Sequence, residues 1–262
     1  YYSLYGDVGE PPGKAFDGWK VSVVLNSDGV MSGETFFGVS AGADQALDEF
    51  DIRRPRALAA INDVYFERPE WDYDYPTFGS DIRAVMQQTE EWNFKVSAEP
   101  NRPSRLTFTG IQEIPAEYEV WLFDKSSGKS VNMHSDSSYA FVSPLRTIEF
   151  TVVVGTKEAV LKKASELLPT EFSLSQNFPN PFNPTTNVRV TVPVRSQIRL
   201  TIYNLLGQRV STLYEGVIDA GISWYTWNGK DEHQSDVTSG VYFCRLETDG
   251  GRPSIVRMIL MK

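Results

Sequence analysis

The chain has 262 residues and a formal net charge of −9, and 41% of its residues are hydrophobic. This length favours two domains of ordinary size rather than one large domain. No apolar run approaches the roughly 18 residues that a membrane-spanning helix needs, so we expect no membrane span.

The acidic charge is concentrated in the first part of the chain. Residues 1–165 hold 25 of the 34 acidic and 16 of the 25 basic residues, which leaves 9 of each for residues 166–262. Because a nucleic-acid-binding domain needs a positive stripe, this distribution argues against nucleic acid as a partner. The single cysteine, Cys244, excludes an internal disulfide framework and a multi-cysteine metal site.

Alternating apolar residues in the first part predict strands with one buried face, and the regular turn signals favour an antiparallel sandwich. We expect strands at residues 16–26, 92–99, 105–109, 118–124 and 147–154. Residues 42–63 break this pattern, and Pro55 limits any helical turn there. The sequence KEAVLKKASELL at residues 157–168 has apolar residues at helical spacing and predicts a helix that ends before Pro169.

The predicted fold class is all-β, with two antiparallel β-sandwich domains joined by a short helical linker. We place an acidic domain at residues 1–156, the linker at 157–171 and a second domain at 172–262. The number and spacing of strands in the second domain are typical of an immunoglobulin-like sandwich. These strands are expected at residues 187–194, 197–204, 208–214, 222–227, 240–248 and 254–261.

The second domain opens with the proline-rich sequence QNFPNPFNPTT at residues 176–186. Each proline fixes its own φ and disfavours helix at the preceding residue, which predicts an extended, stiff ribbon. The sequence IYNLLGQ at residues 202–208 predicts a hairpin turn in which Gly207 supplies a positive φ. Gly229 and Gly240 are expected to serve in the same way.

The order PNPFNPTT, IYNLLGQ and GVYF, followed by a basic last residue, resembles the type A C-terminal sorting domain of the type IX (Por) secretion system. The residues that carry the resemblance are Pro179, Asn180, Pro181, Phe182, Gly207, Gly240, Tyr242 and Lys262. The resemblance implies that the export machinery of the outer membrane recognises this domain and often removes it. It predicts a protein at the outer surface of a Bacteroidetes-like bacterium or in the extracellular space. Because the sequence begins at Tyr1 without a Met, we also expect that a signal peptide has been removed.

We expect no enzyme activity and no catalytic residue. His134 lies in a polar turn, and Ser135 and Asp136 are too close to it in sequence to complete a Ser-His-Asp triad. The chain has no GxSxG nucleophile motif. Paired carboxylates for glycoside hydrolysis leave no trace in a sequence, but a domain of residues 1–156 is small for such an enzyme.

Two groups of carboxylates are weak candidates for Ca²⁺, a cation that takes several oxygen ligands. The first group is Asp44, Asp48 and Asp51 with the neighbouring Glu49, and the second is Asp72, Asp74 and Asp81. Neither has the spacing of an EF-hand loop, so solvated acidic loops are the favoured interpretation. We therefore predict no metal site and no cofactor, with Ca²⁺ as the alternative.

The sequence RPEWDYDYPTF at residues 68–78 is dense in aromatic and acidic side chains. Its rings, Trp71, Tyr73, Tyr75 and Phe78, are expected either to cover the edge of the sandwich or to form a binding surface. A protein interface is favoured over a surface glycan, because Trp and Tyr are frequent anchors of interfaces.

An aromatic N-terminal arm, with Tyr1, Tyr2, Leu4 and Tyr5, precedes a joint rich in Pro and Gly. Such an arm can add a strand to a neighbouring sheet, and a head-to-tail contact that does not close grows into a filament. A frayed terminus is the alternative. The predicted function is a non-enzymatic structural protein of the cell surface that assembles with itself. A surface module that binds a glycan or an envelope protein is the alternative.

Overall fold

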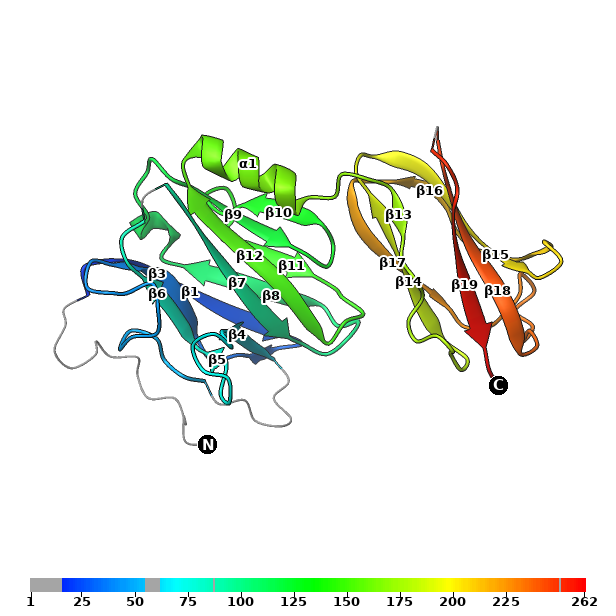
Figure 1. The fold of residues 1–262 in the computed structure, drawn as a ribbon, viewed down its shortest axis with the longest axis horizontal. Coiled ribbons are helices and arrows are strands. Elements are labelled where there is room, and N and C mark those ends of the chain that lie inside the picture. The colour runs from blue at the N-terminus through cyan, green and yellow to red at the C-terminus, as the bar shows by residue number, and fades with distance from the viewer. Residues whose placement is uncertain (1–15, 55–61, 87, 250) are drawn as a thin grey trace. The chain divides into compact units, whose positions relative to one another are not determined.

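The computed structural model describes residues 16–54, 62–86, 88–249 and 251–262. Its internal contacts divide the chain into two compact units, Tyr1–Ser126 with Ser130–Ala164 and Ser127–Lys129 with Ser165–Lys262. Strands dominate both units, which confirms the predicted all-β fold class (Figure 1). None of the helices in the described ranges is long and apolar enough to cross a membrane.

The first unit contains two sheets. One sheet has the order β11-β8-β1-β3-β6, with the short strand β2 beside β1. Its strands are β1 (Gly18–Ser27), β2 (Val30–Met31), β3 (Thr35–Ser40), β6 (Ser80–Arg83), β8 (Ser104–Thr109) and β11 (Ser138–Phe141). Neighbouring strands within this sheet are antiparallel, except that β3 and β6 run parallel to each other. The sheet departs from the predicted antiparallel arrangement at this pair, because the chain passes through the other sheet between these two strands.

The other sheet has the order β10-β9-β12-β7-β4-β5. Its strands are β4 (Asp63–Glu67), β5 (Thr77–Phe78), β7 (Thr89–Ser97), β9 (Glu119–Asp124), β10 (Lys129–Asn132) and β12 (Thr147–Gly155). A short 3₁₀ turn, η1 (Ile111–Glu113), lies between β8 and β9.

Side chains from both sheets form one core. The ring of Trp92 lies 5.8 Å from that of Trp19 and 5.2 Å from that of Phe37, measured between centroids. Phe94 and Phe150 stack at 5.5 Å. Burial of these large rings supplies the main stabilisation, since each Å² of apolar surface removed from water contributes about 25 cal/mol.

The strands predicted from alternation are confirmed as β1, β7, β8, β9 and β12. Strands β3, β4 and β6 were not predicted. Every residue of β3 is buried, because Phe50 and Ala43 from the 41–51 loop pack with Phe36 and Ile82 in a second cluster. A strand buried on both faces shows no alternation in its sequence. Residues 42–54 form turns and bends rather than a helical turn, and residues 55–61 lie outside the described residues.

The predicted helix is confirmed as α1 (Lys157–Leu167). Val160 is its buried residue, and Lys163 pairs with Glu91 of β7 at 2.6 Å. The division between the two units falls inside this helix.

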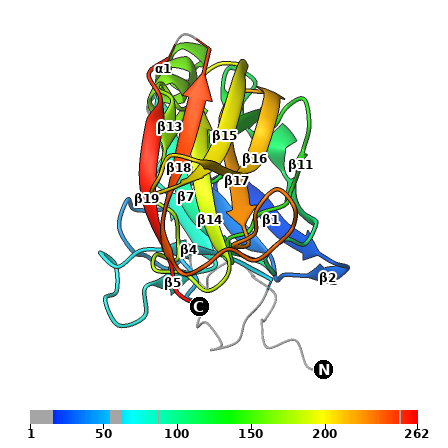
Figure 2. The ribbon, with the colours of Figure 1, turned by 90° about the vertical axis from the view of Figure 1, so that its right-hand side faces the viewer.

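The second unit has a three-stranded sheet, β13-β14-β17, and a four-stranded sheet, β16-β15-β18-β19 (Figure 2). Both contribute to one core, in which Val190, Leu200 and Cys244 are fully buried. The strands are β13 (Ser173–Leu174), β14 (Thr186–Val192), β15 (Ser196–Asn204), β16 (Arg209–Ile218), β17 (Gly221–Trp227), β18 (Gly240–Thr248) and β19 (Ser254–Leu260). All six strands predicted for this region are confirmed. Its immunoglobulin-like character stays a prediction.

Two local predictions for the second unit were wrong. The proline-rich segment bends at residues 179–181 and 183–184 instead of running straight, and its 178–179 and 180–181 peptide bonds are cis. Gly240 is the first residue of β18 and has no positive φ, because the chain there already enters the strand. The expected positive φ is confirmed at Gly207, with 76°, and at Gly229, with 69°.

Candidate functional site

The aromatic loop, residues 68–78, separates into two inward rings and two outward rings. Phe78 is fully buried in the core, and half-buried Trp71 lies against it with a centroid distance of 5.2 Å. Tyr73 and Tyr75 are 88% and 68% exposed. The prediction of Phe78 as a contact residue was therefore wrong. Of the four rings, those of Trp71 and Phe78 pack inward, as the alternative prediction of rings that cover the sandwich edge requires. Tyr73 and Tyr75 remain as the candidate binding residues.

Asp72 fixes the conformation of the loop around the two exposed tyrosines. Its Oδ1 accepts the backbone N–H groups of Asp74 and Tyr75, both at 2.9 Å, while its Oδ2 pairs with Arg53. The hydrogen bond from Arg53, followed by that from the Tyr75 amide, lowers the pKa of the Asp72 carboxyl. At the neck of the loop, the Arg68 N–H donates to the Pro76 carbonyl at 2.7 Å. The exposed rings are therefore mounted on a loop with a defined shape.

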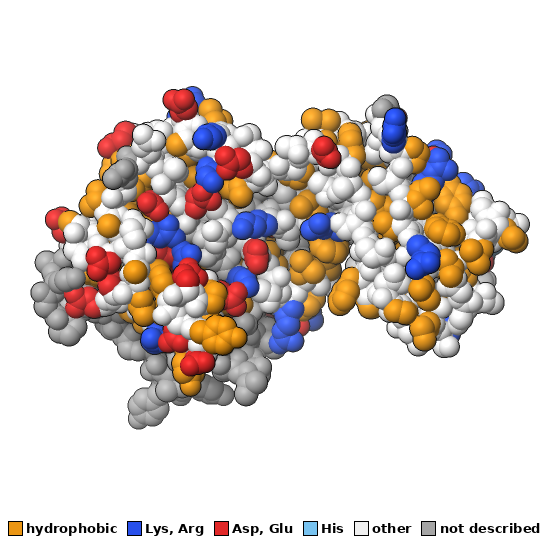
Figure 3. Space-filling model, viewed as in Figure 1, with side chains coloured by type: hydrophobic (Ala, Val, Ile, Leu, Met, Phe, Trp, Pro, Cys, Tyr) orange, Lys and Arg blue, Asp and Glu red, His pale blue; other side chains and the backbone are white. Residues whose placement is uncertain are grey.

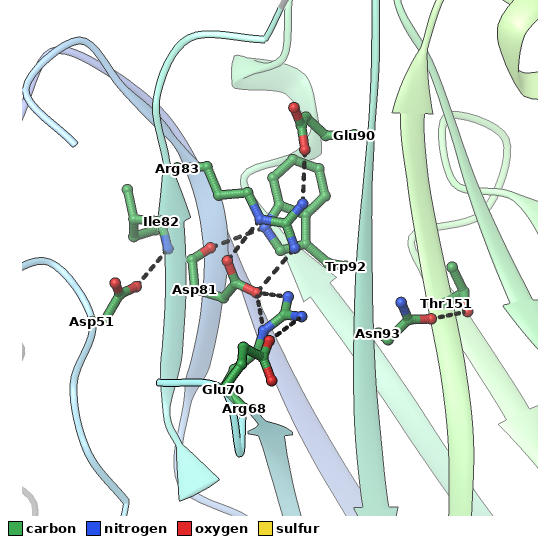
Figure 4. Close-up of polar contacts among 10 residues, drawn as sticks. All are labelled: Asp51, Arg68, Glu70, Asp81, Ile82, Arg83, Glu90, Trp92, Asn93 and Thr151. Carbon is green, nitrogen blue, oxygen red and sulfur yellow. Dashed lines mark hydrogen bonds and ion pairs between the residues drawn. The ribbon is translucent and has the colours of Figure 1, made fainter. Parts of the chain in front are cut away.

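An alternating chain of charges lies beneath this loop (Figure 4). The side chain of Asp81 is fully buried between two guanidinium groups, with the Nε of Arg68 at 3.1 Å and the Nε of Arg83 at 2.9 Å. Arg83 continues to Glu90 at 2.7 Å, and Arg68 reaches Glu70 at 3.6 Å. A buried carboxylate requires such partners, because desolvation of an unpaired charge is costly.

The charge chain is also attached to the aromatic core. The guanidinium of Arg83 lies 4.9 Å from the ring centroid of Trp92, and Trp92 Nε1 donates to the Asp81 carbonyl at 3.0 Å. Arg68 lies 5.3 Å from the ring centroid of Trp71 in the same manner. The loop is thus connected through two arginines to the centre of the first unit, which limits the entropy that it would lose on binding.

The sequence did not reveal the role of Arg68, Asp81 and Arg83. Asp81 was assigned to a weak Ca²⁺ group, although its two oxygens are occupied by arginines. Because Arg68 and Asp81 are 13 residues apart in the sequence, no local sequence pattern indicates their ion pair. On the face shown in Figure 3, acidic and basic side chains are interspersed over the first unit.

The carboxylates of the first Ca²⁺ candidate bind backbone amides. Asp48 accepts the N–H groups of Asp44 at 2.6 Å and Phe50 at 2.7 Å, and Asp51 accepts those of Ile82 at 3.0 Å and Asp48 at 3.1 Å. Burial raises the pKa of Asp51 to about 7. Within the described ranges, no three His, Cys, Asp or Glu side chains come together as a metal site. These carboxylates shape the loop that covers β3.

His134 lies in an exposed turn, as its sequence predicts. Its Nε2 is 3.1 Å from the Tyr118 carbonyl, and its N–H donates to Asn132 Oδ1 at 2.9 Å. The ring is therefore engaged with backbone rather than with a hydroxyl nucleophile.

The motif residues of the second unit divide into a buried group and an exposed group. Phe182 is 2% exposed and lies 5.5 Å from the ring of Trp227, which in turn lies 5.0 Å from the ring of Tyr242. The Tyr242 hydroxyl donates to the Thr238 carbonyl at 2.7 Å. Phe182 and Tyr242 thus hold the core together.

The exposed group includes Pro179, Asn180, Pro181, Gly207 and Lys262. The N–H of Lys262 donates to Ser239 Oγ at 2.9 Å, and its Nζ lies 3.4 Å from Asp236. At the hairpin tip, Leu205 and Leu206 are 68% and 82% exposed, and neither was predicted as a site residue. Two consecutive leucines in a predicted turn are the signal that would have found them.

A groove of about 520 Å³ lies between this hairpin and the 231–238 loop. Its carboxylates are engaged, since Glu232 pairs with Arg209 at 3.0 Å and Asp236 with Lys262. The N-terminal arm with Tyr1, Tyr2, Leu4 and Tyr5 lies outside the described residues.

Residues 176–262 match the family model of the secretion system C-terminal sorting domain. The predicted resemblance is therefore confirmed. The sorting domain indicates export through the type IX secretion system to the cell surface or the extracellular space, with the export machinery as a partner.

No curated protein matches the chain. Among solved structures, PorZ of Porphyromonas gingivalis, a surface component of the type IX secretion system, is 18% identical. The match covers 42% of this chain and 14% of PorZ, with a TM-score of 0.25. Dimeric latent PorU of the same organism is 11% identical over 94% of this chain and 30% of PorU, with a TM-score of 0.30. A polysaccharide lyase is 7% identical over 94% of this chain and 40% of the lyase, with a TM-score of 0.26. The chain spans less than half the length of each, and similarity at this level does not define its function.

Proposed function

We propose that the chain is a non-enzymatic surface protein whose sorting domain directs its export and whose first unit binds a protein of the cell envelope. The observation that carries this proposal is the exposure of Tyr73 and Tyr75 on a braced loop. Exposed rings on a pre-organised loop are typical of binding sites, since tyrosine supplies a large contact area at a low entropic cost.

The charges around the two rings indicate the character of the partner. Asp74 is exposed between the tyrosines. Glu70 is also exposed, with Arg68 3.6 Å away, whereas Arg53 is engaged with Asp72. The tip therefore presents aromatic and acidic groups together, which complements a surface that contains Lys or Arg. Such an encounter is weakened by salt, whereas stacking on a neutral glycan is not.

The non-enzymatic assignment is supported by the engagement of the candidate chemical groups. His134 is hydrogen bonded to backbone, Asp81 to two arginines, and Asp51 to two amides. Each of these groups already has a structural role.

The test compares binding of the intact chain and of its variants to cell envelopes isolated from a bacterium that has a type IX system. We expect the double variant Tyr73→Ala/Tyr75→Ala to bind at least about tenfold more weakly, the size typical of interface anchors. Phe178→Ala, which removes a ring that is 78% exposed in the sorting domain, is the matched control and should bind normally.

The partner class is separated in the same assay. Protease treatment of the envelopes should abolish binding if the partner is a protein. Binding that survives protease and is insensitive to salt, with a signal on a glycan array, would assign the loop to a glycan. Equal binding by the double variant and the unaltered chain would contradict both assignments.

Self-assembly into a structural layer or filament is the second proposal. The favouring observation is the short hairpin of β1 and β2, where Val30 and Met31 are 57% and 65% exposed and form an apolar contact point. Light scattering and negative-stain microscopy of the intact chain test it. Filaments that disappear in Val30→Ser/Met31→Ser support assembly through this hairpin, and a monomer of 29.5 kDa excludes it.

A further inference from the structure

Strand β19 lies at the edge of the four-stranded sheet and has β18 as its neighbour (Figure 2). An edge strand presents a row of unpaired N–H and C=O groups, which favours fraying or pairing with another chain. In this sorting domain, residues 176–182 cover that edge. We call these residues the edge cap.

The edge cap hydrogen bonds to the backbone of β19 at Arg257 and Ile259. The Arg257 carbonyl accepts Gln176 Nε2 at 2.7 Å and Asn180 Nδ2 at 3.2 Å. The Ile259 N–H donates to Asn180 Oδ1 at 2.9 Å. One amide side chain, that of Asn180, thus serves one donor and one acceptor of the strand and imitates a neighbouring peptide group.

Phe182 continues the same edge with its own backbone. Its N–H donates to the Ile259 carbonyl at 3.0 Å, and its carbonyl accepts the Met261 N–H at 2.9 Å. The ring of Phe182 is buried against Trp227, so this end of the edge cap is anchored in the core.

The other end of the edge cap is held by Asn177, which is 2% exposed. Its amide donates to the Pro179 carbonyl at 2.9 Å and to Thr186 Oγ1 at 2.8 Å. Asn180 is therefore placed between two anchors, although its own side chain is exposed to solvent.

We propose that Asn180 is a positioning residue of the sorting signal. With Gln176, it covers the edge of β19 and holds the C-terminal strand in the ordered form that export requires. This inference rests on export through the sorting domain. It differs from direct recognition, in which the export machinery would contact the exposed asparagines of the motif themselves.

Asn183 provides the matched control within the same motif. It is also an exposed asparagine followed by a proline, but its side chain makes no hydrogen bond to another described residue. Direct recognition predicts that Asn180 and Asn183 are both needed. The edge-cap proposal predicts that only Asn180 is needed.

The experiment uses the full chain in two measurements. Amide hydrogen exchange of the purified chain should be about five- to tenfold faster at Ile259 in Asn180→Ala, because its N–H loses a hydrogen bond. Export in a bacterium with a type IX system, measured on the cell surface and in the medium, should fall at least about fivefold, in line with the lost order. Asn183→Ala should change neither quantity. Asn180→Asp keeps the acceptor for Ile259 but loses the donor to the Arg257 carbonyl, so it should restore both quantities only in part.

Two results would overturn the proposal. One is equal loss of export in Asn180→Ala and Asn183→Ala, and the other is normal export of Asn180→Ala despite faster exchange. If Asn180→Ala does not fold, Gln176→Ala tests the same edge, and normal exchange and export of that variant would be equally decisive against it. Deletion of residues 176–262 tests the export assignment separately, since unchanged export of the truncated chain would refute that assignment itself.

Discussion

The carboxylate of Asp51 accepts the backbone N–H of Ile82 at 3.0 Å, which ties the 41–51 loop to strand β6. The second oxygen of the same carboxylate accepts the N–H of Asp48. Asp51 is buried because this loop covers the outer face of β3. The same covering removes from β3 the alternation of apolar and polar residues that would have marked it as a strand in the sequence.

The buried carboxylate of Asp51 predicts a specific pH dependence of stability. Burial raises the pKa of Asp51 from 3.8 to about 7 in the folded chain, so the folded state binds more protons than the unfolded state between these values. Its contribution to stability is therefore largest at low pH and is lost as the pH rises from about 4 to 7, by roughly 2 kcal/mol after solvent screening is allowed for.

Denaturant unfolding of the unaltered chain and of Asp51→Asn at several pH values measures this contribution. Asp51→Asn loses the acceptor for the Asp48 N–H and should be less stable at pH 5, but the difference between the two proteins should shrink towards pH 7.5. A difference that stays constant across this range would show that Asp51 does not titrate as its burial predicts.

The ion pairs around Asp81 predict a large effect of removing one arginine. Arg68→Met leaves a fully buried carboxylate with Arg83 as the remaining partner, so we expect a loss of about 2–4 kcal/mol of unfolding free energy. Arg102→Met is the control, since Arg102 pairs with Asp28 at 3.7 Å and both side chains are mostly exposed. That variant should change stability by no more than about 0.5 kcal/mol. Equal effects of the two variants would contradict the structural role of the buried chain.

The sequence predicted strands where one face is buried and the other is not. The alternation of Trp19, Val21, Val23 and Leu25 located β1 in this way. It could not locate β3, because both faces of Phe36 and its neighbours are covered by segments distant in the sequence. Alternation of apolar and polar residues therefore cannot locate a strand whose outer face is covered by a loop.

The candidate binding loop was also predicted only in part. Composition identified residues 68–78 as unusual, but four aromatic rings in eleven residues do not reveal which of them face inward. Phe78 is buried because it pairs as β5 with Phe66 of β4, and this register depends on residues outside the loop. Tyr73 and Tyr75 are left exposed because the short turn capped by Asp72 carries them away from the sheet.

The motif PNPFNP was recognised as a unit, whereas its residues have separate physical roles. Asn180 binds the edge of β19, Phe182 fills the core, and Asn183 is exposed. The pattern of prolines predicted a straight ribbon and gave no indication that the segment bends back onto the last strand. This contact joins residues that are 79 positions apart in the sequence.

The hydroxyl of Tyr242 provides a conservative test of the motif GVYF. Tyr242→Phe keeps the ring against Trp227 and removes the hydrogen bond to the Thr238 carbonyl. We expect a loss of about 1–2 kcal/mol, because a partly buried carbonyl is left without its donor. Tyr203→Phe, which alters a half-exposed tyrosine of β15, is the control and should have little effect on the denaturation midpoint. Equal midpoints for the two variants would show that the Tyr242 hydroxyl does not stabilise the fold.

Phe182 of the sorting motif and Phe178 just before the motif predict different results from the same substitution. Phe182→Ala removes a ring that is 2% exposed and packed on Trp227, so we expect a loss of about 3–5 kcal/mol of unfolding free energy. Phe178→Ala removes a ring that is 78% exposed and should change stability by no more than about 0.5 kcal/mol. Denaturant unfolding followed by tryptophan fluorescence measures both, since Trp227 lies beside Phe182.

Because the backbone of Phe182 also pairs with β19, Phe182→Ala should increase hydrogen exchange at Met261, which Phe178→Ala should leave unchanged. A stable Phe182→Ala variant with slow exchange at Met261 would mean that the ring is not what anchors the edge cap.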